Sequence, residues 1–327
     1  MREHRALLVC LTVLLAAPGC SMLALAGGQL ALINNQLPLP AAIAQEQDPA
    51  RRALLREVPS ILAFAEDVVG LQVGRSYSGY FETERSGLTY VVTACARTGF
   101  DAYRWWFPIV GTVEYRSYWD EAQAHAVASE LEAEGYDTWV SPSRAYSSLG
   151  ILRDPITTTM LRDGLSGLAE VLIHELSHAK LFIPGQTDWN EALASFVGER
   201  GAEQYFRGAR FAGSPLQTEV ERRLERRATF DQAVAQAFVE LEQLYASARP
   251  ESEKLALRQG VFDRLSAELR ARFPEDPLRD VRVNNARLLH FRRYTAHGVV
   301  LEQLWAASGR SFRRFWRVAE HYAHTRL

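Results

Sequence analysis

The segment Ala169–His178, which reads AEVLIHELSH, constrains the fold of this chain more than any other. Apolar residues recur through it at helical spacing and would bury most of one helix. His174 and His178 stand four residues apart, so both imidazoles project from the same helical face and can bind a single metal ion. Glu175 follows the first histidine, where a carboxylate can take a proton from water at the metal. We therefore expect a stiff, buried helix that carries a metal site and a general base.

A third metal ligand is expected on the next helix. A catalytic zinc ion is held tetrahedrally by three protein ligands and leaves its fourth position to water. Glu191 lies thirteen residues after His178, and Pro184-Gly185 between them predicts a turn that returns the second helix to the metal. We predict one zinc ion per chain, bound by His174, His178 and Glu191.

The remaining pattern predicts an α+β fold that is mainly helical. Helical periodicity covers residues 51–71, 157–182, 189–207, 216–248, 251–272, 284–307 and 311–324. Aromatic and β-branched residues at 90–94, 105–115 and 137–140 favour strands, with an amphipathic helix at 120–134 between them. We expect a domain of residues 51–327, with a small α/β part at 88–150 and a helical part at 157–327 that holds the zinc site.

Charge and composition narrow the partners. The formal net charge is 37 − 39 = −2, which argues against binding nucleic acid through bulk positive charge. Gly27-Gly28 lacks the surroundings of a phosphate-binding loop, so no nucleotide is expected. A peptide substrate is the partner that a metal site of this kind implies.

The first twenty residues predict export. Residues 1–19 combine a basic start with a short apolar tract, which is typical of a signal peptide. The small residues before Cys20 resemble a bacterial lipobox, which predicts lipidation of Cys20 and a lipid-anchored segment at 20–50. By resemblance to such lipoproteins, we expect the periplasmic face of the outer membrane; ordinary secretion is the alternative. Cys95 would then be a lone buried thiol.

Several motifs together resemble the bacterial "predicted aminopeptidase" lipoprotein family. They include Arg75-Ser76-Tyr77, residues 106–111 (WFPIVG), residues 115–119 (YRSYW), residues 145–150 (AYSSLG), residues 174–182 (HELSHAKLF) and Asn284-Asn285-Ala286. The helix opening with Asn190-Glu191-Ala192 is also similar to the zinc-ligand helix of gluzincin peptidases. The resemblance implies zincin-like catalytic helices and a zinc-dependent exopeptidase of the cell envelope, most simply an aminopeptidase. The alternatives are an envelope metallo-endopeptidase and a non-catalytic lipoprotein with a structural or vestigial zinc site.

The resemblance is incomplete around the metal. Thermolysin-like enzymes place an Asp one turn after the ligand Glu, and Ser195 occupies that position here. Asp188, Asn190 and Glu199 are therefore the candidates for orienting the ligands.

An oxyanion formed during hydrolysis also needs a donor opposite the base, for which Tyr146 and Tyr294 are the candidates. His297 lies on the same predicted late helix as Tyr294.

Overall fold

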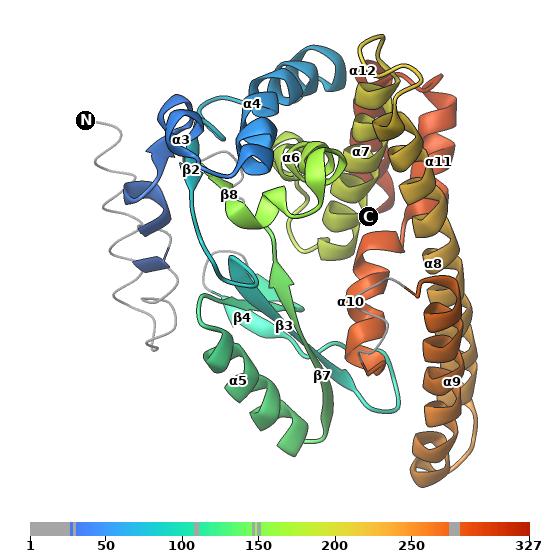
Figure 1. Cartoon of the computed structure of the whole chain (residues 1–327). Coiled ribbons are helices and arrows are strands. Elements are labelled where there is room, and N and C mark those ends of the chain that lie inside the picture. The colour runs from blue at the N-terminus through green and yellow to red at the C-terminus, as the bar shows by residue number, and fades with distance from the viewer. Residues whose placement is uncertain (1–26, 29–30, 108–110, 146–147, 149–151, 275–281) are drawn as a thin grey trace.

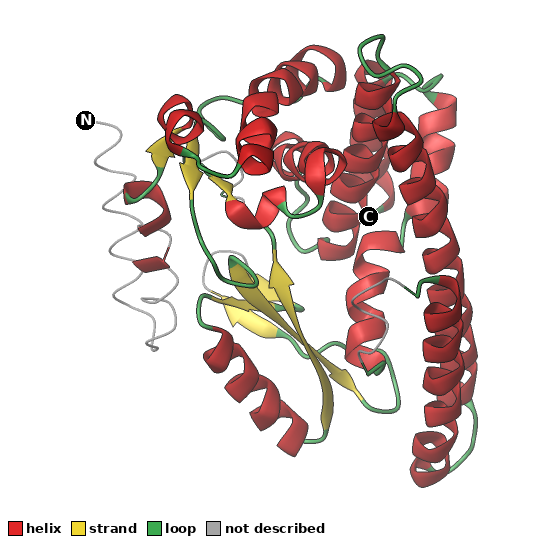
Figure 2. Cartoon of the chain, in the orientation of Figure 1, coloured by secondary structure: helices red, strands yellow, loops and turns green. Residues whose placement is uncertain are grey.

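Two neighbouring helices, α6 (Gly164–Lys180) and α7 (Thr187–Arg207), form the centre of the molecule (Figure 1). They pack against each other more extensively than any other two elements. The computed structural model describes residues 27–28, 31–107, 111–145, 148, 152–274 and 282–327. Helices dominate these residues, and three small sheets accompany them (Figure 2).

The elements around this centre follow in chain order. The helical elements are α3 (Leu39–Gln45), α4 (Pro49–Phe64), a π-helical turn η1 (Ala65–Val69), α5 (Glu121–Ala133), a 3₁₀ turn η2 (Thr158–Leu161), α8 (Pro215–Ala246), α9 (Glu251–Arg272), α10 (Asn285–Thr295), α11 (Gly298–Ala307) and α12 (Phe312–Arg326). The strands are β1 (Leu37–Pro38), β2 (Gly79–Phe81), β3 (Thr89–Ala96), β4 (Trp105–Phe107), β5 (Gly111–Val113), β6 (Arg116–Tyr118), β7 (Tyr136–Ser143) and β8 (Ile156–Thr157).

Local sequence explains where several helices begin. Asp48, Asp120, Ser214 and Asn284 each accept a hydrogen bond from a backbone N–H in the first turn of the helix that follows. Such side-chain caps satisfy donors that the helix itself cannot pair. Proline at the start of α4 and of α8 adds a fixed φ angle that suits a first helical turn.

A three-stranded antiparallel sheet, in the order β6-β3-β7, separates α5 from α10. Alternate residues of β3 face opposite sides: Tyr90, Val92 and Ala94 pack with α5, whereas Cys95 packs with Ala286 and Leu289 of α10. Cys95 is fully buried and free, and burial raises the pKa of its thiol to about 12. The expectation of a lone buried thiol is therefore confirmed.

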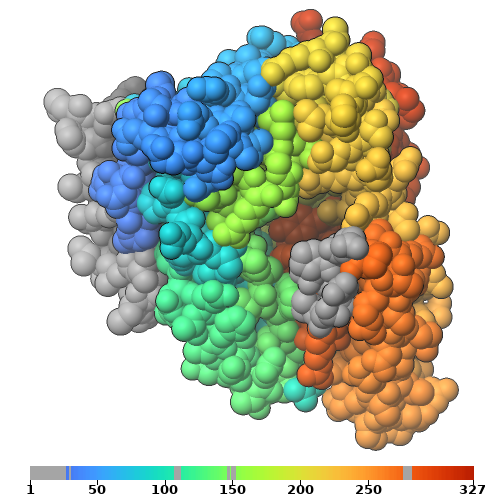
Figure 3. Space-filling model, viewed as in Figure 1, coloured from blue at the N-terminus to red at the C-terminus, as the bar shows by residue number. Residues whose placement is uncertain are grey.

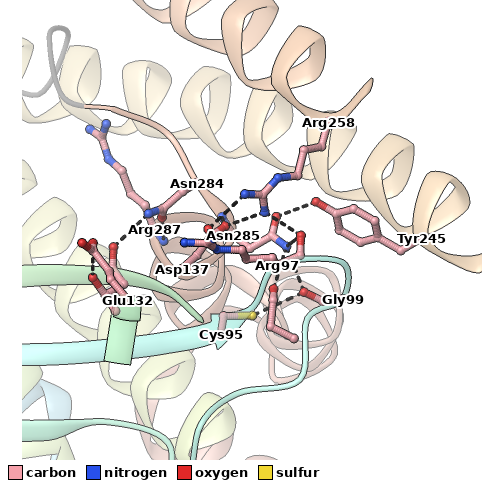
Figure 4. Close-up of polar contacts among 12 residues, drawn as sticks. Cys95, Arg97, Gly99, Glu132, Asp137, Tyr245, Arg258, Asn284, Asn285 and Arg287 are labelled. Atoms are coloured by element: carbon pink, nitrogen blue, oxygen red, sulfur yellow. Dashed lines mark hydrogen bonds and ion pairs between the residues drawn. The ribbon is translucent and has the colours of Figure 1, made fainter. Parts of the chain in front are cut away.

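A buried polar cluster fixes the start of α10 to this sheet (Figure 4). The carboxylate of Asp137 on β7 accepts hydrogen bonds from the Arg258 guanidinium at 2.8 and 3.1 Å and from the backbone N–H of Asn285 at 3.0 Å. The Asn285 amide donates to three backbone carbonyls between residues 96 and 99, and its oxygen accepts from the Tyr245 hydroxyl. The cluster thus joins β3, β7, α8, α9 and α10.

The largest hydrophobic core surrounds the central helix pair. It combines apolar faces of α4, α6, α7, α11 and α12, whereas α8 and α9 share a second core. The space-filling view is hollowed between yellow-green residues of α6 and yellow residues of α8, with dark red residues of the C-terminal helices at the base (Figure 3). Within the described residues, no helix has the length and apolar character needed to cross a membrane.

The mainly helical α+β class is confirmed, and two element predictions are wrong in detail. The helix expected at 284–307 is two helices, because the backbone leaves helical geometry at His297 and Gly298 is a poor helix former. The helix expected at 157–182 begins only at Gly164. Before it, Ile156 and Thr157 form β8, which pairs in parallel with β2, because β-branched residues favour extended backbone.

Candidate metal centre

The structure brings the three predicted ligands together between α6 and α7. The Nε2 atoms of His174 and His178 are 3.2 Å apart, and Oε2 of Glu191 lies 3.6 and 3.8 Å from them, respectively. A tetrahedral zinc ion with bonds of about 2.1 Å separates its ligand atoms by about 3.4 Å. Both the distances and the donor set of two imidazoles and one carboxylate therefore fit zinc.

The turn between the two helices sets the position of Glu191. Asn190, which is buried, accepts a hydrogen bond from the backbone N–H of Ile183 and donates one to its carbonyl, both at 2.9 Å. Gly185 supports the same turn with a φ of 79°, in the left-handed region that glycine adopts without strain. Asn190 thus acts on the site through the backbone of the turn, one residue before the predicted ligand.

The face of α7 that carries Glu191 continues with small residues at helical spacing. Ser195 lies one turn later, and its hydroxyl is 3.3 Å from Nδ1 of His174. Gly198 lies one turn further, where an added Cβ would come within 2.8 Å of the Glu170 carbonyl oxygen and 3.2 Å of the His174 Cβ. The short side chains let α7 approach α6 closely enough for Glu191 to reach both histidines.

Ser195, rather than a carboxylate, therefore approaches the second nitrogen of His174. Glu199 faces Arg227 at 4.0 Å instead, and Asp188 lines a cavity beside the first turn of α7. A hydrogen bond to the outer nitrogen of a ligand histidine fixes its ring orientation. The structure places Ser195 to do this.

Burial controls the charges at the centre. Burial lowers the pKa of His178 to about 4, so this imidazole is neutral and can bind a metal. For Glu191, burial is outweighed by His178, His174 and Arg293, which hold its pKa at about 2. For His174, burial is outweighed by Glu191 and Glu175, which raise its pKa.

Glu175 is the fourth acidic or basic side chain of the centre. Burial raises its pKa to about 7; Glu191 and Asp154 add to the rise, and His174 opposes it. A carboxyl group with a pKa close to neutrality can both accept and release a proton at working pH. Glu175 therefore has the protonation behaviour of a general acid and base.

Helix α10 brings two further polar rings toward the centre. Burial raises the pKa of Tyr294 far above its usual range, and the charges of Glu191 and Glu175 add to the rise. Burial also lowers the pKa of His290 to about 3, and its ring lies 5.4 Å from that of Tyr294. In the part of the chain that the structure describes, Nδ1 of His290 has no hydrogen-bond partner. Tyr294 is thus a protonated hydroxyl close to both carboxylates.

Arg293 connects the centre with the β4–β5 hairpin. Its buried guanidinium stacks over the Tyr115 ring at 4.7 Å and approaches the backbone carbonyl of Glu114 at 3.5 Å. Its charge also helps to lower the pKa of Glu191.

His290, Arg293 and Tyr77 are not among the site residues predicted from the sequence. His290 and Tyr294 are four residues apart and so share one helical face, a signal that could have indicated His290. Tyr77 is buried, has a φ of 60°, and its raised pKa reflects burial and then the nearby charges of Glu175 and Asp154. A positive φ in a bulky residue is strained backbone, which sequence does not reveal.

Two other predicted site residues are not placed with the predicted metal ligands. His297 precedes α11, with its ring 5.3 Å from that of Trp189. Tyr146 is outside the described residues, so its predicted role stays a prediction.

Comparison with known proteins supports the kind of chemistry that this centre suggests. Residues 21–326 match the protein family described as "Putative aminopeptidase". The matched range includes α6, α7 and α10, and it also includes Tyr77. No curated protein and no solved structure matches the chain. Because the match spans nearly the whole sequence, the chain belongs to the "Putative aminopeptidase" family.

Proposed function

We propose that this protein is a zinc-dependent aminopeptidase that hydrolyses peptide bonds in the bacterial cell envelope. The proposal depends on one observation: His174, His178 and Glu191 converge beside the half-buried Glu175. The family description supports a peptidase, and the donor set and its spacing support zinc.

Glu175 performs the proton transfers in this proposal. Zinc bound by the three ligands would polarise the scissile carbonyl and acidify water. Glu175 takes the proton from the attacking water and passes it to the nitrogen of the leaving amine. Burial raises the pKa of Glu175, which favours uptake of the proton, and bound zinc would oppose that rise and favour its release.

Tyr294 stabilises the charge that develops on the substrate carbonyl oxygen. Its raised pKa keeps the hydroxyl protonated, so it can donate a hydrogen bond throughout the reaction. His290 packs against the Tyr294 ring and, being neutral, adds no positive charge that would draw the tyrosine proton away.

The test separates metal binding from chemistry. Glu175→Gln should retain about one zinc per chain, because Glu175 is not a ligand. Its rate of peptide hydrolysis should fall roughly a hundredfold or more, because the general base is removed. The double variant His174→Ala, His178→Ala should lose zinc as measured by metal analysis. Stoichiometric zinc in the double variant would contradict the ligand assignment. If the unaltered protein hydrolyses neither N-blocked nor unblocked peptides, the result would favour a non-catalytic lipoprotein.

The location in the envelope rests on the first twenty residues, which lie outside the described structure. We propose a lipid anchor at Cys20 that holds the protein on the periplasmic face of the outer membrane. Acyl chains would supply the membrane affinity, since the net charge without residues 1–19, 35 − 38 = −3, gives no attraction to anionic lipid. Cys20→Ala should move the protein from the membrane to the soluble periplasmic fraction. Equal solubility of both forms, with no acylated N-terminal peptide in mass spectrometry, would leave only ordinary export.

A further inference from the structure

A cavity of about 570 Å³ lies between the β4–β5 hairpin and the first turn of α7, the helix that carries Glu191. Arg104, Thr112 and Glu114 line the hairpin side, and residues 185–188 line the helix side. Its volume falls within the range of sites that hold a small ligand or part of a larger one.

Asp188 is the carboxylate that this cavity leaves without a cationic partner. Arg104 and Glu114 pair with each other at 3.2 Å, so their charges cancel. Within the described ranges, Asp188 forms no ion pair with a lysine or arginine, and the positive charge of Arg293 is buried toward Glu191. His297 faces Asp188, but burial lowers the pKa of that imidazole, which is therefore mostly neutral at pH 7. The lining thus favours a cationic group.

Asp188 lies one helical turn from the predicted ligand Glu191. Asp188 precedes Glu191 by three residues, so the two carboxylates are neighbours on α7, with Cβ atoms about 5–6 Å apart. In an amino acid, the amino nitrogen lies only about 2.5 Å from the carbonyl carbon of the same residue. A carboxylate one helical turn from the metal ligands can therefore bind the ammonium group of the residue whose carbonyl is attacked.

An exposed indole lies on the hairpin face that borders the same cavity. Trp106 is directly opposite Thr112 in the β4–β5 register, and residues in this relation share one face of a hairpin. Because Thr112 lines the cavity, Trp106 projects on the cavity side, where it is 71% exposed. Trp105, on the other face, is buried against Tyr103. An apolar side chain of a bound peptide can pack on the exposed ring.

We propose that this cavity binds the first residue of the peptide substrate, with the carboxylate of Asp188 holding its free α-ammonium group and Trp106 contacting its side chain. The proposal rests on the proposed peptidase function and specifies its substrate as a peptide with an unblocked amino terminus. Asp188 acts here as a substrate-binding residue and takes no part in proton transfer.

Binding to a hydrolysis-impaired protein tests the subsite without requiring turnover. The zinc-loaded Glu175→Gln protein is titrated by calorimetry with a tripeptide amide that begins with leucine and with its N-acetyl form. We expect the free amine to bind about tenfold more tightly, as a charge-assisted hydrogen bond in a partly buried site implies. Adding Asp188→Asn should reduce this preference to less than about twofold and leave the affinity of the acetylated peptide unchanged. Glu242→Gln, which alters an exposed carboxylate on α8, is the matched control and should keep the preference.

Trp106 has a separate readout in the same titrations. Trp106→Ala should weaken binding of the leucine peptide severalfold and leave that of a glycine peptide unchanged, since glycine offers no side chain to the indole. Zinc content and melting temperature, measured for each variant, show whether the protein is folded and loaded.

Three results would overturn the proposal. They are equal affinities for the free and acetylated peptides, a preference that survives Asp188→Asn, and a preference for peptides with a free carboxyl terminus, which would make Arg104 and the α7 N-terminus an anion site. Hydrolysis is measured separately with Glu175 intact. Absence of cleavage would contradict the proposed function, whereas the binding comparison tests the subsite alone.

Discussion

At the scale of single residues, the geometry of the centre depends on small residues on the face of α7 that packs against α6. Glu191, Ser195 and Gly198 follow one another on this face, and their side chains become smaller along the helix. Gly201 continues the row, since an added Cβ there would lie 2.9 Å from a methyl group of Ile173. The distance between the helices, and with it the distance from Glu191 to the histidines, is set by these small residues.

Gly198→Ala should therefore weaken the metal site without touching a ligand. The new Cβ meets the Glu170 carbonyl, part of the α6 backbone, which cannot move aside as a flexible side chain would. We expect at least a tenfold loss of zinc affinity in chelator competition, in line with the effect of displacing groups that support metal ligands. Gly260→Ala on α9 is the control, because its Cβ would make only an ordinary contact at 3.5 Å. Unchanged zinc affinity in Gly198→Ala would show that the two helices can separate without loss of the site.

At the scale of elements, sequence predicted the parts of the structure whose signals are local. The spacing of His174 and His178, and a proline-glycine turn before Glu191, were sufficient to predict the two central helices and the proximity of these three residues. The sheet of β1, β2 and β8 could not be read in the same way, because strands of two or three residues carry little periodicity. The approach of α10 to the centre depends on contacts between distant segments, which no local pattern encodes.

The buried polar cluster around Asp137 holds α10 to the sheet (Figure 4). Asp137 and Arg258 are both largely buried, with 8% and 11% of their side chains exposed. Asp137→Asn should lower the free energy of unfolding in urea by about 3 kcal/mol, because it leaves the Arg258 charge buried without its partner. Glu253→Gln, which breaks the much more exposed pair with Arg249, should cost less than about 1 kcal/mol. An equal loss of unfolding free energy in the two variants would mean that the buried cluster stabilises the fold no more than an exposed ion pair does.

At the scale of the whole molecule, α8 connects the two hydrophobic cores and also covers charged side chains between the central helices. Glu170 pairs with Arg223 at 3.1 Å, and Glu199 lies 4.0 Å from Arg227, which also contacts Asp231. Three carboxylates therefore share two arginines at the junction of α6, α7 and α8. Such a group makes the stability of the fold depend on pH.

Glu199 gives this dependence a definite sign. Burial raises its pKa in the folded protein from 4.5 to about 7, with Arg227 opposing the rise. The folded state therefore holds this proton more tightly than the unfolded state, and the stability it contributes at pH 4.5 is lost as pH rises to about 7. Glu199→Gln removes the titration, so the variant should gain on the unaltered protein by roughly 1–2 kcal/mol between pH 5 and pH 8.

The measurement compares thermal unfolding of the two proteins at each pH, so that effects common to both, such as loss of metal at low pH, cancel. A gain of this size corresponds to a relative shift in melting temperature of about 1.5–3 °C for a chain of this length. Glu225→Gln changes an exposed carboxylate on α8 and should show no such shift. A difference between Glu199→Gln and the unaltered protein that stays constant from pH 5 to pH 8 would mean that Glu199 is already ionised in the fold, with Arg227 compensating for its burial.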